Sequence, residues 1–236
     1  MVRPCWYRPP GRDPSPGLPK GCFSFPRRLP DKRPGWTGKL FLPESWFAPE
    51  MAAERQRLGI PAERGFETKI ELGWRMIQRV QVPFEAVAFD DLYGRSGWLR
   101  AQLRQADIVY MADVPQDTQV YLSRPEVGVP QPQPGQRGRR PKRSRVLSEA
   151  KPVEVRQVSL RPDIRWKQVR VRSTERGELN DAFALRRVWT LWEGQPVEEW
   201  LVMRRSGEGD TSYALSNASA DTPLERLAWL MCQRYF

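Results

Sequence analysis

Apolar and polar residues alternate with clear periods over most of the chain, but not in its first part. Residues 1–35 are rich in Pro, Gly and Arg and contain no apolar repeat. Such a segment cannot bury enough apolar surface to fold, so we expect a disordered basic tail there. From Trp36 onward, apolar runs recur between Gly and Pro turns, and ordered structure is predicted to begin.

Two helices are predicted in the segment that follows. The first covers residues 48–60 and ends at Gly59, just before Pro61. The second begins after Thr68, which together with Glu71 has the spacing of a capping box. Its apolar face comprises Ile70, Trp74, Ile77 and Val80.

A strand–helix–strand unit is predicted next. Residues 84–89 form one short apolar run, and residues 107–114 form a second. Between them, Ser96 can cap a helix whose apolar stripe comprises Leu99, Leu103 and Ala106. Two strands joined by a helix imply a parallel pair with a right-handed crossover, and such a pair belongs to an α/β sheet covered on both faces.

Residues 125–151 interrupt this periodicity. The stretch is rich in Pro, Gly and Arg and predicts an exposed, flexible basic loop. Its cations can bind the phosphates of a nucleic acid of any sequence, or can lie in solvent without a partner, and both interpretations stay open. These cations are Arg137, Arg139, Arg140, Lys142, Arg143 and Arg145.

Residues 152–218 show the period of β-strands. Five strands are expected, within 153–160, 166–174, 183–192, 197–205 and 211–218. Arginines and tryptophans are interleaved in these strands, so one face of the sheet is expected to be basic, with most of the tryptophans in the core. Residues 222–236 then predict an amphipathic helix that begins at Thr222 and Pro223.

Charge and composition narrow the function. The formal net charge is +11, from 39 Lys and Arg against 28 Asp and Glu, which favours a polyanionic partner, nucleic acid before a membrane surface. No apolar run is long enough to span a membrane, and no membrane association is expected. The chain contains no histidine, so Ser-His-Asp hydrolysis, Cys-His catalysis and His-ligated zinc are excluded. Its three scattered cysteines fit neither a metal site nor a disulfide framework, and a cytoplasmic location is expected.

The stretch Phe-Asp-Asp-Leu-Tyr-Gly, residues 89–94, places two adjacent carboxylates where a predicted strand ends. Aspartates at strand ends usually form turns. Ligands of α/β sheets also gather at the carboxyl ends of strands, so Asp90 or its neighbour Asp91 could bind a metal ion. The residues alone leave both interpretations open.

Several motifs line up in order between Leu40 and Phe236. They are LFLPESWF, GFETKIELGWRMI, FDDLYGRSGWLRAQL, WLVMRRSGEGDTSYALSNA and TPLERLAWLMCQRYF. Together they resemble a bacterial insertion-sequence transposase of the DDE, RNase H-like class, in the group named for insertion sequence seven-hundred-and-one.

The resemblance implies a fold class and a division of the chain. The expected fold is α/β: a partial RNase H-like fold interrupted by an antiparallel β-rich insertion, with a disordered basic N-terminal tail. The expected parts are a tail (1–35), a partial core (36–124), a flexible basic loop (125–151), a β-rich insertion (152–218) and the start of the closing core helix (219–236).

The resemblance also implies a chemistry, namely transposition by phosphoryl transfer at two Mg²⁺ ions held by three carboxylates. It makes Asp90, in its Asp-x-x-Tyr-Gly setting, the second of these carboxylates. Nothing before Trp36 resembles the strand that carries the first Asp. On the closing helix Arg234 matches the family's Arg, Met231 replaces its Tyr, and its Glu would fall beyond Phe236. We therefore expect a truncated fragment that keeps one metal ligand, holds Mg²⁺ poorly and is catalytically inactive.

Two hypotheses of function follow. The first is a DDE-type transposase, most simply such an inactive fragment, and the alternative is a non-catalytic DNA-binding protein that interferes with an intact transposase. Both imply DNA, specifically transposon ends, as the partner, and both leave a homo-oligomer open. The residues expected to bind DNA are Arg139, Arg140, Lys142, Arg143 and Arg234. An RNA-binding protein is suggested by net charge alone, without any RNA-binding signature.

Overall fold

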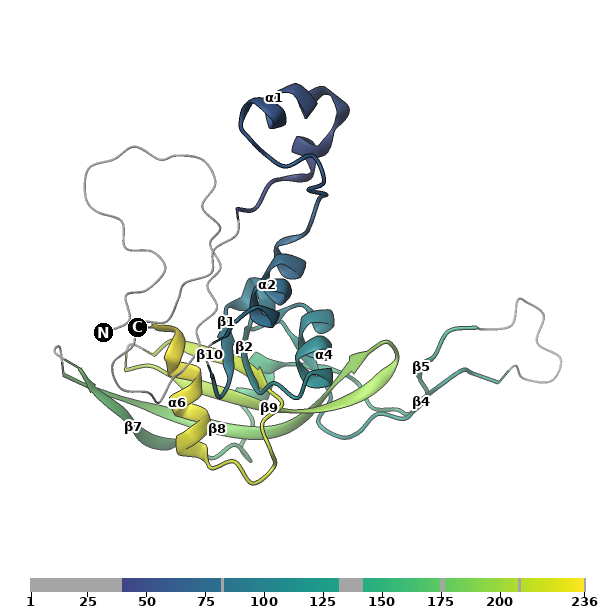
Figure 1. The fold of residues 1–236 in the computed structure, drawn as a ribbon. Coiled ribbons are helices and arrows are strands. Elements are labelled where there is room, and N and C mark those ends of the chain that lie inside the picture. The colour runs from purple at the N-terminus through teal and green to yellow at the C-terminus, as the bar shows by residue number, and fades with distance from the viewer. Residues whose placement is uncertain (1–39, 82, 132–141, 175–176, 208, 236) are drawn as a thin grey trace.

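The structure of the chain is a computed structural model that describes residues 40–81, 83–131, 142–174, 177–207 and 209–235 (Figure 1). The predicted tail, residues 1–35, lies outside this part of the chain. The helices are η1 (Glu44–Phe47), η2 (Pro49–Met51), α1 (Ala52–Arg57), α2 (Lys69–Gln78), α3 (Asp91–Gly94), α4 (Gly97–Gln105), α5 (Val155–Ser159), α6 (Leu224–Met231) and η3 (Cys232–Tyr235). The strands are β1 (Val87–Phe89), β2 (Tyr110–Val114), β3 (Gln119–Val120), β4 (Val127–Gly128), β5 (Arg145–Val146), β6 (Val153–Glu154), β7 (Lys167–Thr174), β8 (Gly177–Trp192), β9 (Gln195–Arg205) and β10 (Thr211–Ser216).

One six-stranded sheet organises the described chain. Its strand order is β1-β2-β10-β9-β8-β7, and only β1 and β2 are parallel to each other. The pairs β3–β6 and β4–β5 form two small antiparallel sheets. The strands of the expected β-rich insertion therefore share a sheet with the predicted core, because β10 pairs directly with β2. The boundaries proposed for the separate parts stay a prediction.

The predicted strand–helix–strand unit is confirmed. Val87 is paired with Tyr110 and Phe89 with Ala112 in a parallel register, and α4 connects the two strands. Ser96 caps α4 by accepting a hydrogen bond from the backbone N–H of Leu99 at 3.2 Å. The capping box of α2 is also confirmed, since the side chains of Thr68 and Glu71 each accept a backbone N–H of the other.

The long β8–β9 hairpin closes through a two-residue turn. Trp192 pairs with Gln195, and the turn residues Glu193 and Gly194 have φ values of 48° and 73°. Positive φ at both central residues is the geometry that follows the right-handed twist of a two-stranded ribbon. The turn therefore sets the register of the two strands that cross the centre of the sheet.

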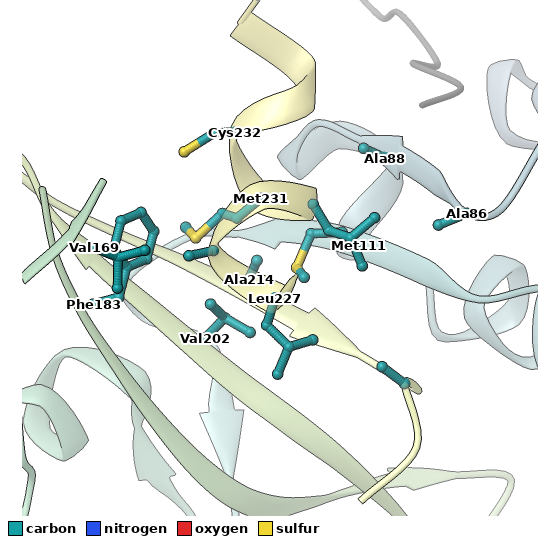
Figure 2. Close-up of a cluster of buried hydrophobic side chains, with 13 residues drawn as sticks. Ala86, Ala88, Met111, Val169, Phe183, Val202, Ala214, Leu227, Met231 and Cys232 are labelled. Atoms are coloured by element: carbon teal, nitrogen blue, oxygen red, sulfur yellow. The ribbon is translucent and has the colours of Figure 1, made fainter. Parts of the chain in front are cut away.

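The sheet has a helix-covered core on each face. Along β2, Met111 packs with α6 on one face, whereas Tyr110 and Ala112 pack with α2 and α4 on the other. Figure 2 shows the first of these cores, in which Leu227 and Met231 of α6 lie over the strands. A third cluster, which includes Val155 and Val158 of α5, extends the second face. The expectation of a sheet covered on both faces is met around β2.

Three expectations about elements are wrong. Val80 does not belong to the apolar face of α2, because that helix ends at Gln78. Residues 155–159 of the expected strand 153–160 form α5, because Val155, Val158 and Ser159 are buried with the i, i+3, i+4 spacing of a helix. Ala106 does not extend the apolar stripe of α4, because it is the exposed residue after the helix ends.

Candidate functional site

Asp90 lies directly after β1 and caps the short helix α3. Its backbone is extended (φ −76°, ψ 178°), and its side chain accepts the backbone N–H of Tyr93 at 3.4 Å. Asp91 is exposed in the first turn of α3, where its Oδ2 lies 4.0 Å from Nη2 of Arg95. The geometry thus shows the turn-forming role of Asp90, while its role as a metal ligand stays a prediction.

The Tyr-Gly pair that follows holds this turn against the sheet. Tyr93 is buried and packs with Val87 and Tyr110 of the adjacent strands. A Cβ atom added to Gly94 would lie 1.8 Å from the backbone oxygen of Asp113 in β2, which is far inside van der Waals contact. The chain therefore requires glycine at position 94 for α3 to approach β2 this closely.

A second aspartate, which sequence reasoning missed, lies on the strand beside this turn. The parallel register pairs Phe89 with Ala112, so Asp90 and Asp113 come next at the carboxyl ends of neighbouring strands. Asp113 is 9% exposed. Its signal in the sequence was a single acid inside the apolar run Tyr-Met-Ala-Asp-Val, where an unpaired charge would be costly.

A further acid on the α6 side of the sheet, Asp181, is already paired with an arginine. Oδ2 of Asp181 accepts a hydrogen bond from Nε of Arg204 at 2.8 Å, and both side chains are largely buried. Burial, first of all, raises the pKa of the nearby Cys232 thiol to about 11, with a further contribution from the negative charges of Asp181 and Asp113. This thiol is therefore protonated and unreactive at neutral pH.

The arginines of the sheet do not form the expected basic face. Arg186 and Arg187 are consecutive in β8 and so point to opposite faces. Most of these cations also have acidic or aromatic partners, so their charge is locally balanced. The pairs are Arg170–Glu178 (2.6 Å), Arg186–Asp163 (2.8 Å), Arg187–Glu198 (2.8 Å) and Arg204–Asp181 (2.8 Å), while Arg205 lies 4.2 Å from the ring centroid of Trp166.

The predicted DNA-binding cations are only partly described. Lys142 and Arg143 are exposed just before β5, in a hairpin that extends away from the six-stranded sheet (Figure 1). Arg139 and Arg140 lie outside the described residues. The backbone of Arg234 is in η3, but its side chain is outside the described part of the structure. DNA binding by these five residues stays a prediction.

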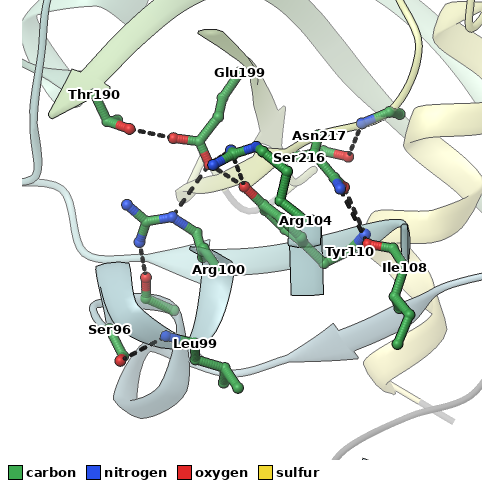
Figure 3. Close-up of polar contacts among 12 residues, drawn as sticks. Ser96, Leu99, Arg100, Arg104, Ile108, Tyr110, Thr190, Glu199, Ser216 and Asn217 are labelled. Carbon is green, nitrogen blue, oxygen red and sulfur yellow. Dashed lines mark hydrogen bonds and ion pairs between the residues drawn. The ribbon is translucent and has the colours of Figure 1, made fainter. Parts of the chain in front are cut away.

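The most buried acid of the described chain is Glu199, which sequence reasoning also missed. Its side chain is fully buried in β9, on the side of α4 (Figure 3). Oε1 accepts the hydroxyl of Tyr110 at 2.5 Å and lies 3.1 Å from Nε of Arg100 and 3.8 Å from Nη2 of Arg104. Oε2 accepts the hydroxyl of Thr190. We call these five residues the Glu199 cluster.

The Glu199 cluster is a compensated buried charge. A buried carboxylate is tolerated only when cations and hydrogen-bond donors replace its water shell, and here both oxygens are satisfied. Burial and the adjacent Glu199 charge raise the pKa of Tyr110 well above that of an ordinary tyrosine, so its hydroxyl remains a donor. Arg100 also donates from Nη1 to the backbone oxygen of Gly94, which ties the cluster to the turn after Asp90.

The model of the DDE superfamily endonuclease family matches residues 36–178, a segment that includes β1, β2 and the Asp90 turn. The chain belongs to the DDE superfamily of endonucleases. This membership confirms the broader part of the expected resemblance and implies a DNA substrate. No curated protein and no solved structure matches the chain.

Superfamily endonucleases typically use divalent metal ions, so the acids of this chain can be tested for fit. Among the residues that the structure describes, no three His, Cys, Asp or Glu side chains come together in a group that could hold an ion. Asp90 caps a helix and Asp181 is paired with Arg204. The described acids do not fit a site of three carboxylates. Within the same residues, no helix is long and apolar enough to cross a membrane.

Proposed function

We propose that this DDE superfamily protein is a DDE-type transposase protein of the insertion-sequence-seven-hundred-and-one group that binds transposon-end DNA without cutting it. Family membership supports the DNA partner. The position of Asp90 at the carboxyl end of β1 supports its descent from a metal-binding site. The observation that carries the proposed inactivity is that the described acids near Asp90 do not assemble the three ligands that two-ion catalysis needs.

Cleavage by the full chain tests the catalytic half of this proposal. Terminal-repeat duplexes labelled at one 5′ end are incubated with Mg²⁺ and either the wild type or Asp90→Asn. The expected result is no strand cleavage or joining by the wild type above the level of Asp90→Asn. Mg²⁺-dependent cleavage that is present in the wild type and lost in Asp90→Asn would overturn the proposed inactivity.

Salt-dependent binding tests the DNA half. Each phosphate contact that is lost lowers the slope of log affinity against log salt by about one. The double variant Lys142→Gln/Arg143→Gln is therefore expected to lower this slope by up to about two. Arg57→Gln is the matched control, because Arg57 is an exposed cation on α1 that pairs with Glu54 at 2.5 Å. Absence of any salt-dependent DNA binding by the wild type would refute a DNA partner.

The absence of a three-carboxylate site among the described residues also supports a second function, namely interference with an intact transposase. A chain that occupies transposon ends without cutting them would compete with an active enzyme for the same DNA. Adding the wild type to a cleavage reaction run by an intact transposase on its own ends is expected to slow that reaction. Undiminished cleavage at concentrations that saturate the DNA would exclude this role.

A further inference from the structure

A cavity of about 460 Å³ lies at the carboxyl end of β2, on the side of the sheet that carries the Glu199 cluster. Arg95 lines it from the segment that joins α3 to α4, and Arg100 lines it from α4 itself. Asp117 lines it from the loop after β2, Gln119 lines it from β3, and Tyr121 follows β3. We call this cavity the Arg95 pocket.

The walls of the Arg95 pocket are held in place by the fold. The backbone of Tyr121 exchanges two hydrogen bonds with that of Trp189 in β8, at 2.8 and 2.9 Å. The backbone oxygen of Thr118 accepts the N–H of Val155 at 2.9 Å. Arg100 is fixed by Glu199 and by the backbone oxygen of Gly94. A ligand would therefore meet walls whose backbone is already ordered.

The chemistry of this surface excludes some ligands and favours others. A single carboxylate, that of Asp117, lines the pocket, which is too few for a divalent cation. Two arginines make the pocket unsuitable for a purely apolar ligand. The guanidinium of Arg95 is mostly exposed, and its pairing with Asp91 at 4.0 Å is long and solvent-screened, so an anion can recruit it.

The pocket combines three features that one nucleotide would use together. An arginine can bind a phosphate. The carboxylate of Asp117 and the amide of Gln119 can pair with the polar edge of a base, and the ring of Tyr121, with Pro115 and Pro152, supplies apolar contact for its faces. The volume of the cavity is in the range of small-ligand sites and is much larger than a bare phosphate requires.

We propose that the Arg95 pocket binds a single unpaired nucleotide, with its phosphate at Arg95 and its base between Asp117, Gln119 and Tyr121. This proposal rests on the DNA-binding function proposed above for the source of the nucleotide. The nucleotide would belong to a DNA strand that is unpaired at one position, although a free nucleotide offers the same chemistry.

The test compares two random-sequence duplexes of equal length, one fully paired and one with a single unpaired 2-aminopurine nucleotide. Fluorescence titration with the full chain is expected to give about tenfold tighter binding of the duplex with the unpaired base. Arg95→Gln and Gln119→Ala should each remove most of that preference and leave the affinity for the paired duplex within about threefold, because both side chains are exposed. Arg57→Gln is the control and should keep the preference.

A second arm uses free deoxynucleoside 5′-monophosphates as competitors. Competition against the duplex with the unpaired base, but not against the paired duplex, would show that the pocket also takes a nucleotide that is not part of a strand. Equal affinity of the wild type for both duplexes, together with no binding of free nucleotide, would overturn the pocket while leaving duplex binding intact. A preference that survives in both Arg95→Gln and Gln119→Ala would overturn it as well. Binding of free nucleotide without any binding of DNA would instead refute the proposed function and keep the pocket.

Discussion

The Asp90 turn and the Glu199 cluster each contain an acidic residue, but the two acids differ in burial and in the number of their partners. Asp90 is half-buried at the end of a strand, where it caps one backbone N–H of α3. Glu199 is fully buried in the middle of the sheet and is surrounded by two arginines and two hydroxyl groups. A carboxylate at the margin can exchange its partners for water, whereas one in the interior cannot. We therefore expect the loss of Asp90, the acid in a recognisable motif, to destabilise the protein less than the loss of Glu199.

The two regions are nevertheless joined. Gly94 ends the helix that Asp90 begins, and its backbone oxygen accepts a hydrogen bond from Arg100 of the Glu199 cluster. Gly94 also lies against the backbone of Asp113. A substitution of Gly94 should disturb both regions, whereas a substitution of Asp90 or of Glu199 should mainly affect the region that contains it.

Removing Glu199 is expected to have the largest effect. Glu199→Ala leaves Arg100 and the hydroxyl of Tyr110 buried without their partner, and we expect it to lower the free energy of unfolding by about 3–5 kcal/mol. Urea denaturation measures this loss. The neighbouring Glu198→Ala is the control, because that side chain is exposed and its pair with Arg187 should contribute at most about 1 kcal/mol. Equal losses from the two variants would contradict the structural role of the cluster.

Gly94→Ala is expected to cost about 3 kcal/mol, since the new methyl group would collide with backbone that cannot move freely. Thermal unfolding followed by circular dichroism reports the loss. Gly65→Ala is the matched control, because a Cβ at Gly65 has no neighbour within 4 Å, and it should stay within about 0.5 kcal/mol of the wild type. If Gly94→Ala were as stable as Gly65→Ala, α3 could not approach β2 as closely as described.

Tyr110→Phe is expected to cost about 1–2 kcal/mol at neutral pH, because Glu199 loses one donor. Its effect should also depend on pH. The folded state raises the pKa of Tyr110, so the stability contributed by its protonated hydroxyl is complete below about pH 10 and is lost as the pH rises toward the folded-state value. Urea denaturation between pH 8 and pH 11 should therefore show the wild type and the variant converging at high pH, and curves that stay parallel would contradict the buried position of the hydroxyl.

Asp90→Ala should have the smallest effect on stability, about 1 kcal/mol, because it removes one helix cap. Asp90→Asn should cost less, since an amide oxygen can still accept the Tyr93 N–H. Urea denaturation of both, with Asp91→Ala as an exposed control, measures the difference. A loss as large as that of Glu199→Ala would show that Asp90 is an interior acid and would remove the contrast between the two regions.

Local sequence patterns predicted the described elements well where a residue type acts through its neighbours in sequence, as helix caps and apolar strands do. Thr68 and Ser96 could be identified as helix caps from sequence. A hydroxyl just before a helix accepts a backbone N–H of the first turn, which has no partner within the helix. The apolar runs around Val87 and Met111 gave two parallel strands. The pattern failed at Val155–Ser159. This helix has only five residues, and over so short a segment the spacing of apolar residues cannot distinguish a helix from a strand.

The candidate site was predictable only in part. Asp90 could be placed at a strand end because its motif is contiguous in sequence. The contacts of Glu199 come from Arg100 and Tyr110, which are separated from it by about 90 residues or more, and no periodicity connects them. The walls of the Arg95 pocket likewise come from segments that are distant in sequence and are joined by contacts such as the backbone pair of Tyr121 and Trp189.

The sequence by itself therefore determined the caps, most of the strands, the excess of positive charge, the absence of histidine chemistry and the resemblance to DDE transposases. The tertiary structure alone decided that β10 pairs with β2, that the arginines of the sheet are mostly neutralised by nearby partners, and that Glu199 and not Asp90 is the acid most deeply enclosed. The physical reason is that capping and periodicity act between residues a few positions apart. Burial and charge compensation depend on which distant strands and helices share a face.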